Sequence, residues 1–252
     1  MEVIVLPAAP DVGVAAAGII SRLVAEKPDA VLGLATGGSV KPVYAELHAL
    51  DFSRVTAFLL DEYVGLRRSH PASFHAFMEE HFLSRVNLDR RRFHLPPTEG
   101  DDLAGLCEQF ERDIVAAGGI DLQLLGIGRD GHLGFNEPTS SLASRTRIKT
   151  LTSATREAAR PGFGEEEVPL HVVTMGIGTI LEARHCLLVA DGPAKADAIA
   201  RMVEGPVTAM VPASALQLHP HATVIVDEAA AAGLRLRDYY REVQSNKPQW
   251  QR

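Results

Sequence analysis

The chain has 252 residues, of which 46% are hydrophobic and 23% are charged, and this composition predicts a globular protein with a substantial core. Its formal net charge of −7 argues against a general nucleic-acid-binding protein, because such proteins need a basic face to contact phosphates. No run approaches the roughly 18 consecutive apolar residues of a membrane-spanning helix, so no membrane partner is expected either.

Short apolar runs alternate along the chain with longer amphipathic stretches. A first strand is expected to start at Glu2, and further strands are predicted at 31–35, 55–60, 121–126, 171–175, 186–190 and 222–226. Helical spacing of apolar residues predicts helices at 40–50, 73–86, 102–117 and 194–203. This alternation predicts an α/β fold, a single-domain, modified doubly wound (Rossmann-like), mostly parallel sheet with helices on both faces.

No internal repeat or low-complexity linker divides the chain, so we predict one catalytic domain over residues 1–243. Residues 160–169 combine Pro, Gly and consecutive Glu residues and are predicted to form a loop or flap. Residues 244–252 are polar and are predicted to form a frayed C-terminal tail.

Composition also indicates a compartment. Residues 1–7 contain no basic side chain, so a secretory signal peptide is not expected. Cys107 and Cys186 are the only cysteines, a number that suits reduced thiols better than a disulfide framework. We therefore predict a cytoplasmic protein with two buried, structural cysteines.

Polar or titratable side chains follow several predicted strands. They are Thr36, Gly37, Gly38 and Ser39 after the strand at 31–35, Asp61 after 55–60, Asp130 and His132 after 121–126, and Lys195 after 186–190. Ligands of doubly wound sheets bind outside the carboxyl ends of the strands, where these loops meet. The four segments are therefore expected to converge on one site.

The turn at 36–39 precedes a predicted helix, so its free N–H groups and two hydroxyls suit a phosphate or another anion. It lacks the Gly-Lys-Ser/Thr ending of a Walker A motif and the spacing of a GxGxxG fingerprint, and a plain strand-to-helix turn is the alternative. Lys195 could supply a cation for the same anion, with a solvated surface lysine as the alternative.

Three titratable side chains, Asp130, His132 and Glu137, lie within eight residues among glycines. A carboxylate beside an imidazole can orient the ring and raise its pKa, so this cluster suits proton transfer. Asp61 is a candidate general base, with a helix cap or turn residue as the alternative. His219 and His221 have no Cys or carboxylate partner nearby, so a structural or surface role is favoured and no metal site is predicted.

Five segments together resemble the glucosamine-6-phosphate deaminase (isomerising) family. They are 32–39 (LGLATGGS), 60–66 (LDEYVGL), 126–138 (GIGRDGHLGFNEP), 140–149 (SSLASRTRIK) and 174–181 (TMGIGTIL). The similarity covers residues 3–240, and the family fold agrees with the predicted one. It implies a reaction of amino-sugar metabolism that needs no metal or organic cofactor, in which glucosamine 6-phosphate and water give fructose 6-phosphate and ammonia.

The resemblance also implies catalytic roles. Asp61 would take the proton from carbon 2 of the substrate and deliver it to carbon 1. His132 would open the pyranose ring by moving a proton from the carbon-1 hydroxyl to the ring oxygen. Asp130 and Glu137 would orient His132 and tune its pKa.

The same resemblance implies a phosphate site formed by the turn at 36–39, Lys195 and Arg160. The family carries an arginine in a mobile flap, but the local sequence here is Arg160-Pro-Gly-Phe163 where the family usually has Arg-Phe-Phe. Ala35 also stands where many members have proline, a change from which we expect only a small effect.

Some family members are hexamers that bind the activator N-acetylglucosamine 6-phosphate between subunits, and others are unregulated monomers. Ser140, Arg147 and Lys149 match positions of that allosteric site, with an ordinary basic loop as the alternative. A homohexamer and a monomer are both compatible with this sequence.

Two other functions are alternatives. A 6-phosphogluconolactonase would share the fold and the Asp-Gly-His loop, but the segments DEYVGL and FNEP favour the deaminase. A sugar-phosphate-sensing domain of a transcription regulator would carry an N-terminal helix-turn-helix, and a strand starting at Glu2 leaves no room for one. Such domains also tend to lose the catalytic acids, which are present here.

Overall fold

The structure is a computed structural model that describes residues 1–248. Its main sheet has seven strands in the order β1-β10-β9-β6-β2-β3-β5, and every neighbouring pair is parallel. The strands are β1 (Glu2–Leu6), β2 (Val31–Leu34), β3 (Thr56–Leu59), β5 (Phe93–His94), β6 (Leu122–Leu125), β9 (His185–Ala190) and β10 (Ala222–Asp227). The predicted α/β class with a mostly parallel sheet is confirmed.

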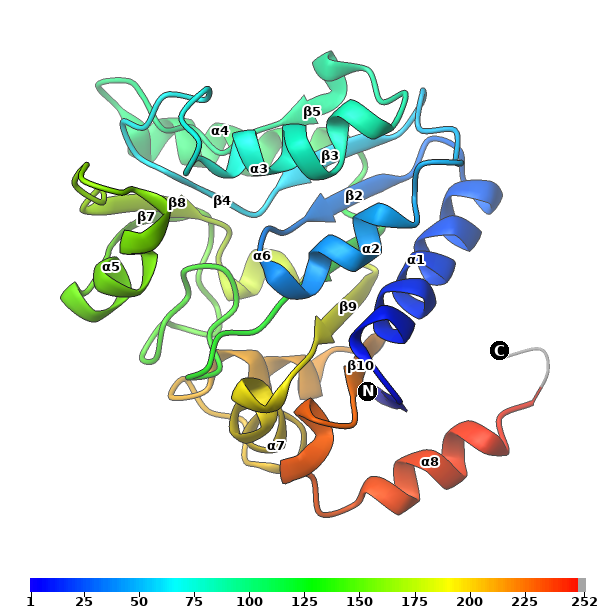
Figure 1. Cartoon of the computed structure of the whole chain (residues 1–252). Coiled ribbons are helices and arrows are strands. Elements are labelled where there is room, and N and C mark those ends of the chain that lie inside the picture. Colours follow the sequence, from blue (N-terminus) through cyan, green and yellow to red (C-terminus); the bar gives the residue numbers. More distant parts are fainter. Residues whose placement is uncertain (249–252) are drawn as a thin grey trace.

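The α-helices of the described chain are α1 (Ala9–Glu26), α2 (Lys41–Ala45), α3 (Phe74–His81), α4 (Leu103–Ala116), α5 (Ser153–Ala159), α6 (Ile177–Leu181), α7 (Ala196–Glu204) and α8 (Arg237–Ser245). Crossovers between parallel strands are right-handed. The connections through α1, α2 and α3 run one way across the strand order, and those through α4, α6 and α7 run the other way. Helices therefore cover both faces of the sheet (Figure 1).

The direction of the strand order reverses between β2 and β6, which are neighbours in the sheet. At such a switch point the loops that leave the two strands separate to opposite faces and open a crevice.

The long helix α1, which the sequence analysis does not predict, buries Val12, Ala16 and Ile20 against the core. Its Gly13 lets α2 approach closely, because a Cβ there would stand 2.5 Å from Cβ of Pro42.

A second, three-stranded antiparallel sheet corrects the prediction that residues 171–175 belong to the parallel sheet. It consists of β4 (Asp61–Tyr63), β8 (His171–Thr174) and β7 (Arg147–Thr150), in the order β4-β8-β7. The chain changes sheet at Leu60, whose N–H donates to Leu34 of β2 and whose carbonyl accepts from Met175. A short apolar run shows that a strand is buried but not which way its neighbours run, so the sequence pattern misassigned this strand.

Several helix boundaries differ from the prediction. The helix predicted at 40–50 ends at Ala45 because the chain continues through turns with i→i+3 hydrogen bonds at Glu46 and Leu47. The helix predicted at 73–86 ends at His81, and a 3₁₀ turn over Leu83–Arg85 follows. Cys107 and Cys186 are unbonded and buried, as predicted.

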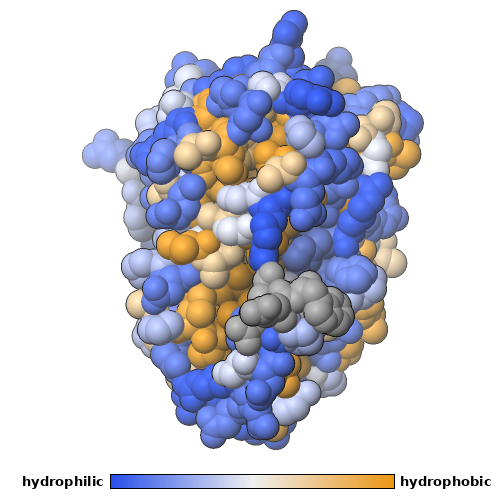
Figure 2. Space-filling view, turned by 90° about the vertical axis from the view of Figure 1, so that its right-hand side faces the viewer, coloured by the Kyte–Doolittle hydropathy of each residue, from blue (hydrophilic) through white to orange (hydrophobic). Residues whose placement is uncertain are grey.

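The predicted tail begins inside α8, which continues to Ser245. Lys247 lies 2.5 Å from the carboxylate of Glu2 on β1. Residues 249–252, the end of the predicted tail, lie outside the described residues. Figure 2 shows one face of the molecule, on which hydrophilic residues surround a band of apolar ones. Within residues 1–248 no helix combines the length and hydropathy that crossing a membrane requires.

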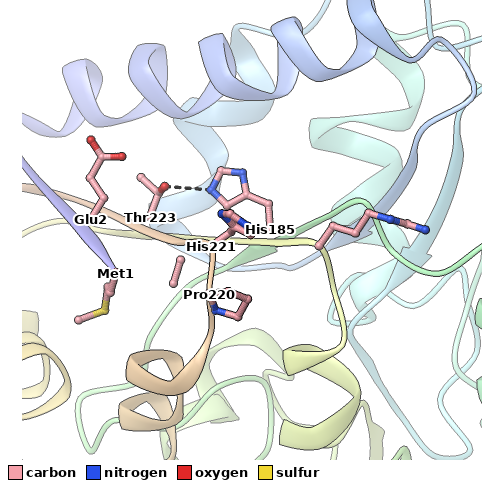
Figure 3. Close-up of a pocket in the computed structure, with 8 residues that line it drawn as sticks. Met1, Glu2, His185, Pro220, His221 and Thr223 are labelled. Atoms are coloured by element: carbon pink, nitrogen blue, oxygen red, sulfur yellow. Dashed lines mark hydrogen bonds between the residues drawn. The ribbon is translucent and has the colours of Figure 1, made fainter. Parts of the chain in front are cut away.

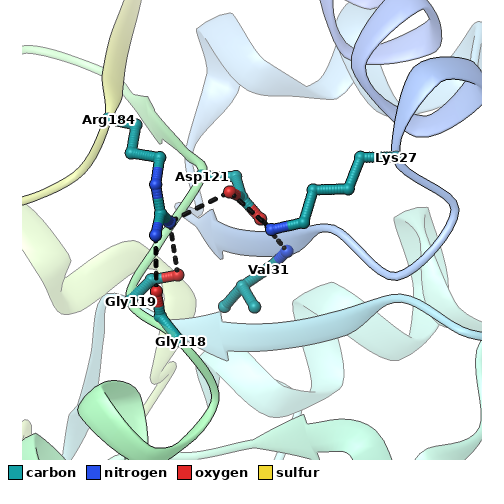
Figure 4. A network of polar contacts seen from close by, with 6 residues as sticks. All are labelled: Lys27, Val31, Gly118, Gly119, Asp121 and Arg184. Carbon is teal, nitrogen blue, oxygen red and sulfur yellow. Dashed lines mark hydrogen bonds and ion pairs between the residues drawn. The ribbon is translucent and has the colours of Figure 1, made fainter.

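At the amino-terminal edge of the sheet, Asp121 joins three strands (Figure 4). Its buried carboxylate accepts hydrogen bonds from Nζ of Lys27 at 2.6 Å, from Nη1 of Arg184 at 3.0 Å and from the N–H of Val31 at 2.8 Å. A pocket of about 530 Å³ opens at the same edge, where His185 bonds to Thr223 (Figure 3). None of the residues with predicted catalytic or phosphate-binding roles lines this pocket.

His219 has the structural role that the sequence analysis favours for His219 and His221. Nε2 of His219 lies 2.7 Å from the carbonyl oxygen of Ala183, and its Nδ1 accepts from the N–H of His221. Both ring nitrogens of His219 are therefore used to hold the turn before β10.

Candidate active site

The loops that follow β2, β6 and β9 meet at the carboxyl edge of the main sheet, as predicted. The ammonium group of Lys195, in the 3₁₀ turn after β9, donates to the carbonyl oxygen of Ile127 after β6 at 2.5 Å. The 3₁₀ turn Gly38–Val40 after β2 packs against β9. In Figure 1, β2 points from the core toward the small sheet, which closes this side of the site.

The turn at 36–39 has an open side. Gly37 has a φ of +122°, a conformation that residues with a side chain rarely adopt. A Cβ added at Gly37 or Gly38 would meet nothing within 4 Å. The glycine backbone is thus exposed at the carboxyl end of β2. Burial and the nearby Arg129 lower the pKa of Lys195, which stands in the turn after β9.

Asp130 and His132 form a close pair. Nδ1 of His132 lies 2.6 Å from Oδ1 of Asp130, and the same oxygen accepts from the N–H of His132. The hydrogen bond from His132 lowers the pKa of Asp130 to about 2, so the carboxylate is charged at neutral pH. The ring also lies against Gly128, where an added Cβ would stand 2.2 Å from Cε1. The imidazole is therefore fixed from two sides, with Nε2 as its other protonation site.

Asp61 stands at the start of β4 and is only 4% exposed. Burial, with a contribution from the charge of Glu62, raises the pKa of Asp61 to about 8. No hydrogen bond to its carboxylate is present within residues 1–248. Its Oδ2 lies beside Gly134, where an added Cβ would be 3.0 Å away. This carboxylate is available for chemistry, and its pKa lies near neutral pH.

Glu62, the next residue, has a structural role. Its carboxylate accepts from the N–H groups of Tyr63, Phe74 and His75, and so satisfies the first turn of α3. The sequence analysis considered a helix cap as the alternative role of Asp61. In the structure it is Glu62 that bonds to the start of a helix.

Glu137 is placed differently from the expectation. Oε1 of Glu137 accepts a hydrogen bond from the hydroxyl of Thr155 in α5. Within the described chain, no hydrogen bond or ion pair joins Glu137 to His132. The orienting partner of His132 in this structure is Asp130 alone.

Asn136 is a further residue of the site that the sequence analysis used only as a family marker. Its side chain is fully buried, and Nδ2 donates to the carbonyl oxygens of Leu133 at 2.9 Å and Met175 at 2.7 Å. The bond to Leu133 closes the loop of His132 on itself, and the bond to Met175 joins this loop to the end of β8. The FNEP motif was the available signal, but only the fold shows which backbone groups Asn136 reaches.

The remaining predicted residues lie around the small sheet. Arg160 is exposed at the end of α5, and no hydrogen bond within residues 1–248 joins it to the turn at 36–39. Ser140 is 4% exposed. Arg147 and Lys149 lie two positions apart on β7, so both side chains leave the same face. Burial lowers the pKa of Arg147. No cluster of three or more His, Cys, Asp or Glu side chains that suits a metal is present in the described part of the chain.

The fold defines a class, an α/β enzyme whose candidate site lies at the switch point of a parallel sheet. The model of the family "Glucosamine-6-phosphate isomerases/6-phosphogluconolactonase" matches residues 8–225. The chain belongs to this family.

Curated relatives of about 50% identity are named glucosamine-6-phosphate deaminase. A glucosamine-6-phosphate deaminase of Arthrobacter sp. (strain FB24) is 54% identical over 100% of this chain and 99% of the relative. The enzyme of that name from Streptomyces avermitilis is 52% identical with the same coverage.

Solved structures agree with this assignment. The structure of a monomeric glucosamine-6-phosphate deaminase aligns with a TM-score of 0.89 and 40% identity, over 92% of this chain and 100% of the other. A 6-phosphogluconolactonase from Trypanosoma brucei aligns with a TM-score of 0.74 at 16% identity, over 92% and 98% of the two chains, and so shows the shared fold alone.

Proposed function

We propose that the site at the carboxyl edge of the main sheet converts glucosamine 6-phosphate and water to fructose 6-phosphate and ammonia. The observation that carries this proposal is the buried carboxylate of Asp61, with a pKa of about 8, at the same edge as the Asp130–His132 pair. Full-length identity near 50% to deaminases, against 16–20% to the lactonase structures, favours this reaction over lactone hydrolysis.

Asp61 acts as the base of the isomerisation. Proton transfer from carbon 2 to carbon 1 needs one group that both accepts and returns a proton, and a pKa near the working pH favours both steps. Burial beside Glu62 raises the pKa of Asp61 toward this range and makes its carboxylate a stronger base than that of a solvated aspartate.

His132 opens the sugar ring. The Asp130 carboxylate on Nδ1 orients the ring, so Nε2 can take the proton of the carbon-1 hydroxyl and deliver it to the ring oxygen. Ring opening yields the open-chain form on which Asp61 acts. The two steps therefore use two different groups, which β4 and the loop after β6 bring to one edge.

The phosphate group of the substrate binds at the 36–39 turn and Lys195, and Arg160 approaches it from the flap. The exposed glycine backbone and the half-buried ammonium group support the first two contacts. The Arg160 contact rests on the family motif, and it requires the flap to move because the side chain is exposed here.

The chain works as a monomer and does not respond to N-acetylglucosamine 6-phosphate. Two observations support this choice between the alternatives that the sequence left open. The structurally similar deaminase is described as monomeric. Ser140, one of the three matched allosteric positions, is buried within this chain and is out of reach of a ligand from solution.

The test is release of ammonia and fructose 6-phosphate from glucosamine 6-phosphate by the purified protein, measured beside hydrolysis of 6-phosphogluconolactone. Equal amounts of ammonia and ketose are expected, and lactone opening without ammonia would overturn the proposal. Light scattering of the same sample checks the monomer. A hexamer with a sigmoidal rate that N-acetylglucosamine 6-phosphate makes hyperbolic would contradict the regulatory part.

A further inference from the structure

Helix α5 has few contacts with the rest of the molecule. None of its residues is buried, and the same holds for the 3₁₀ turn Arg160–Gly162 that follows it. In Figure 1 it lies beside β7 and β8, at the outer side of the small sheet. Ala159 packs against the small apolar cluster around Tyr63 and Phe163. An element with so little buried surface moves more easily than the core, so each polar bond that fixes it matters.

One of these bonds reaches the catalytic loop. The hydroxyl of Thr155 donates to Oε1 of Glu137. The other side-chain bond from α5 to a distant segment runs from Nε of Arg156 to the carbonyl oxygen of Val168, which belongs to the flap itself. Thr155 therefore carries the direct hydrogen bond between α5 and the loop that holds His132.

The position of the Thr155 hydroxyl is itself set by the start of the helix. Thr152 is the N-cap of α5, and its Oγ1 accepts from the N–H of Thr155 at 3.1 Å. The two hydroxyl oxygens lie 2.9 Å apart. The carboxylate of Glu137 thus ends a short chain of hydrogen bonds that exists only while the first turn of α5 is formed.

We propose that Thr155 is a positioning residue for the deamination reaction, which couples the orientation of the Glu137 carboxylate to the position of helix α5. In this structure the Thr155 hydroxyl holds the carboxylate, which makes no hydrogen bond to His132 in the described residues. Movement of α5 shifts the Thr155 hydroxyl and with it the carboxylate. The inference rests on the proposed function and on the role at the site that the family resemblance implies for Glu137, and it adds the residue that positions this carboxylate.

The test compares three single variants of the full chain on glucosamine 6-phosphate. Thr155→Val keeps the shape of the side chain and removes its hydroxyl donor, whereas Thr155→Ser keeps the hydroxyl. The control, Ser153→Ala, removes an exposed hydroxyl on the same helix that makes no side-chain hydrogen bond in the described structure. Loss of a hydrogen bond to a charged group predicts a fall in kcat of about tenfold for Thr155→Val. KM should change less than kcat, and Thr155→Ser should restore most of the rate.

A double-variant cycle with Glu137→Gln separates this inference from the function on which it rests. If Thr155 acts through Glu137, Thr155→Val should have little further effect in the Glu137→Gln background. Normal turnover of Glu137→Gln alone would remove the catalytic role of Glu137. Two outcomes would overturn the positioning role alone. In the first, Glu137→Gln is impaired but Thr155→Val has an unchanged kcat. In the second, Thr155→Val lowers kcat equally in the wild-type and Glu137→Gln backgrounds.

Discussion

Replacing the proposed base, Asp61→Asn, should abolish turnover and stabilise the fold. Asp61 is 4% exposed, and its pKa is raised from 3.8 to about 8. Loss of a general base predicts a fall in kcat of about 10²–10⁴-fold. Asparagine has nearly the same shape and never ionises, so it avoids the cost of keeping a carboxyl group in this buried position.

The magnitude follows from proton linkage. A carboxyl group whose pKa is higher in the folded state binds its proton more tightly there, so its effect on stability becomes unfavourable as the pH rises from about 4 to about 8. The cost is about 2 kcal/mol near pH 5 and about 4 kcal/mol near pH 7, at 1.36 kcal/mol for each pKa unit. These are upper values, because the amide of asparagine also loses its water contacts on burial.

The assay is urea denaturation of the wild type and Asp61→Asn at several pH values between 4 and 8, beside kcat measurements. The free-energy difference between the two proteins should be small at pH 4 and should grow with pH in favour of the variant. Asp29→Asn, at an exposed position, is the control for the chemical change. A difference that does not depend on pH would refute the reasoning from burial, and near-normal kcat would remove Asp61 as the base.

Three further predictions concern two other residues of the site and the ion-pair network at the opposite edge of the sheet. Asp130→Asn should lower kcat on the pyranose substrate about 10–100-fold with little change in KM, because His132 loses its orienting carboxylate. Steady-state kinetics check this prediction, and a change in KM alone would contradict it. Gly134→Ala would place a methyl group 2.8 Å from Oγ1 of Thr174 and 3.0 Å from Oδ2 of Asp61. Displacement of the Asp61 carboxylate should then lower kcat about 100-fold. The control is Gly118→Ala, which also has a positive φ but open space around the added methyl group and should leave kcat unchanged. Asp121→Ala should lower the free energy of unfolding by about 2–4 kcal/mol in urea denaturation, because it breaks the hydrogen bonds to Lys27, Val31 and Arg184. It should not affect kcat, because these bonds lie at the opposite edge of the sheet. A loss of stability below about 1 kcal/mol would contradict the stabilising role of this network.

The sequence alone determined the fold class and the edge of the sheet at which we propose the site. Apolar runs such as Val31–Leu34 are long enough and flanked by enough glycine to predict buried parallel strands, and the loops after parallel strands must share one edge. The closeness of Asp130 and His132 in the sequence was sufficient to predict a carboxylate beside the imidazole, because only Gly131 separates them. These conclusions depend on local pattern and on topology rules, and the structure confirms the fold and the Asp130–His132 contact.

Only the tertiary structure decided the direction of β8, the partner of Glu137 and the raised pKa of Asp61. The antiparallel sheet depends on where the chain leaves β3, at Leu60, and no periodicity encodes that change of sheet. Thr155 lies 18 residues from Glu137, so their contact depends on how α5 folds back over the loop. The pKa of Asp61 is raised because burial removes water from its carboxylate, and burial is a property of the packed molecule that the two letters Asp-Glu do not contain.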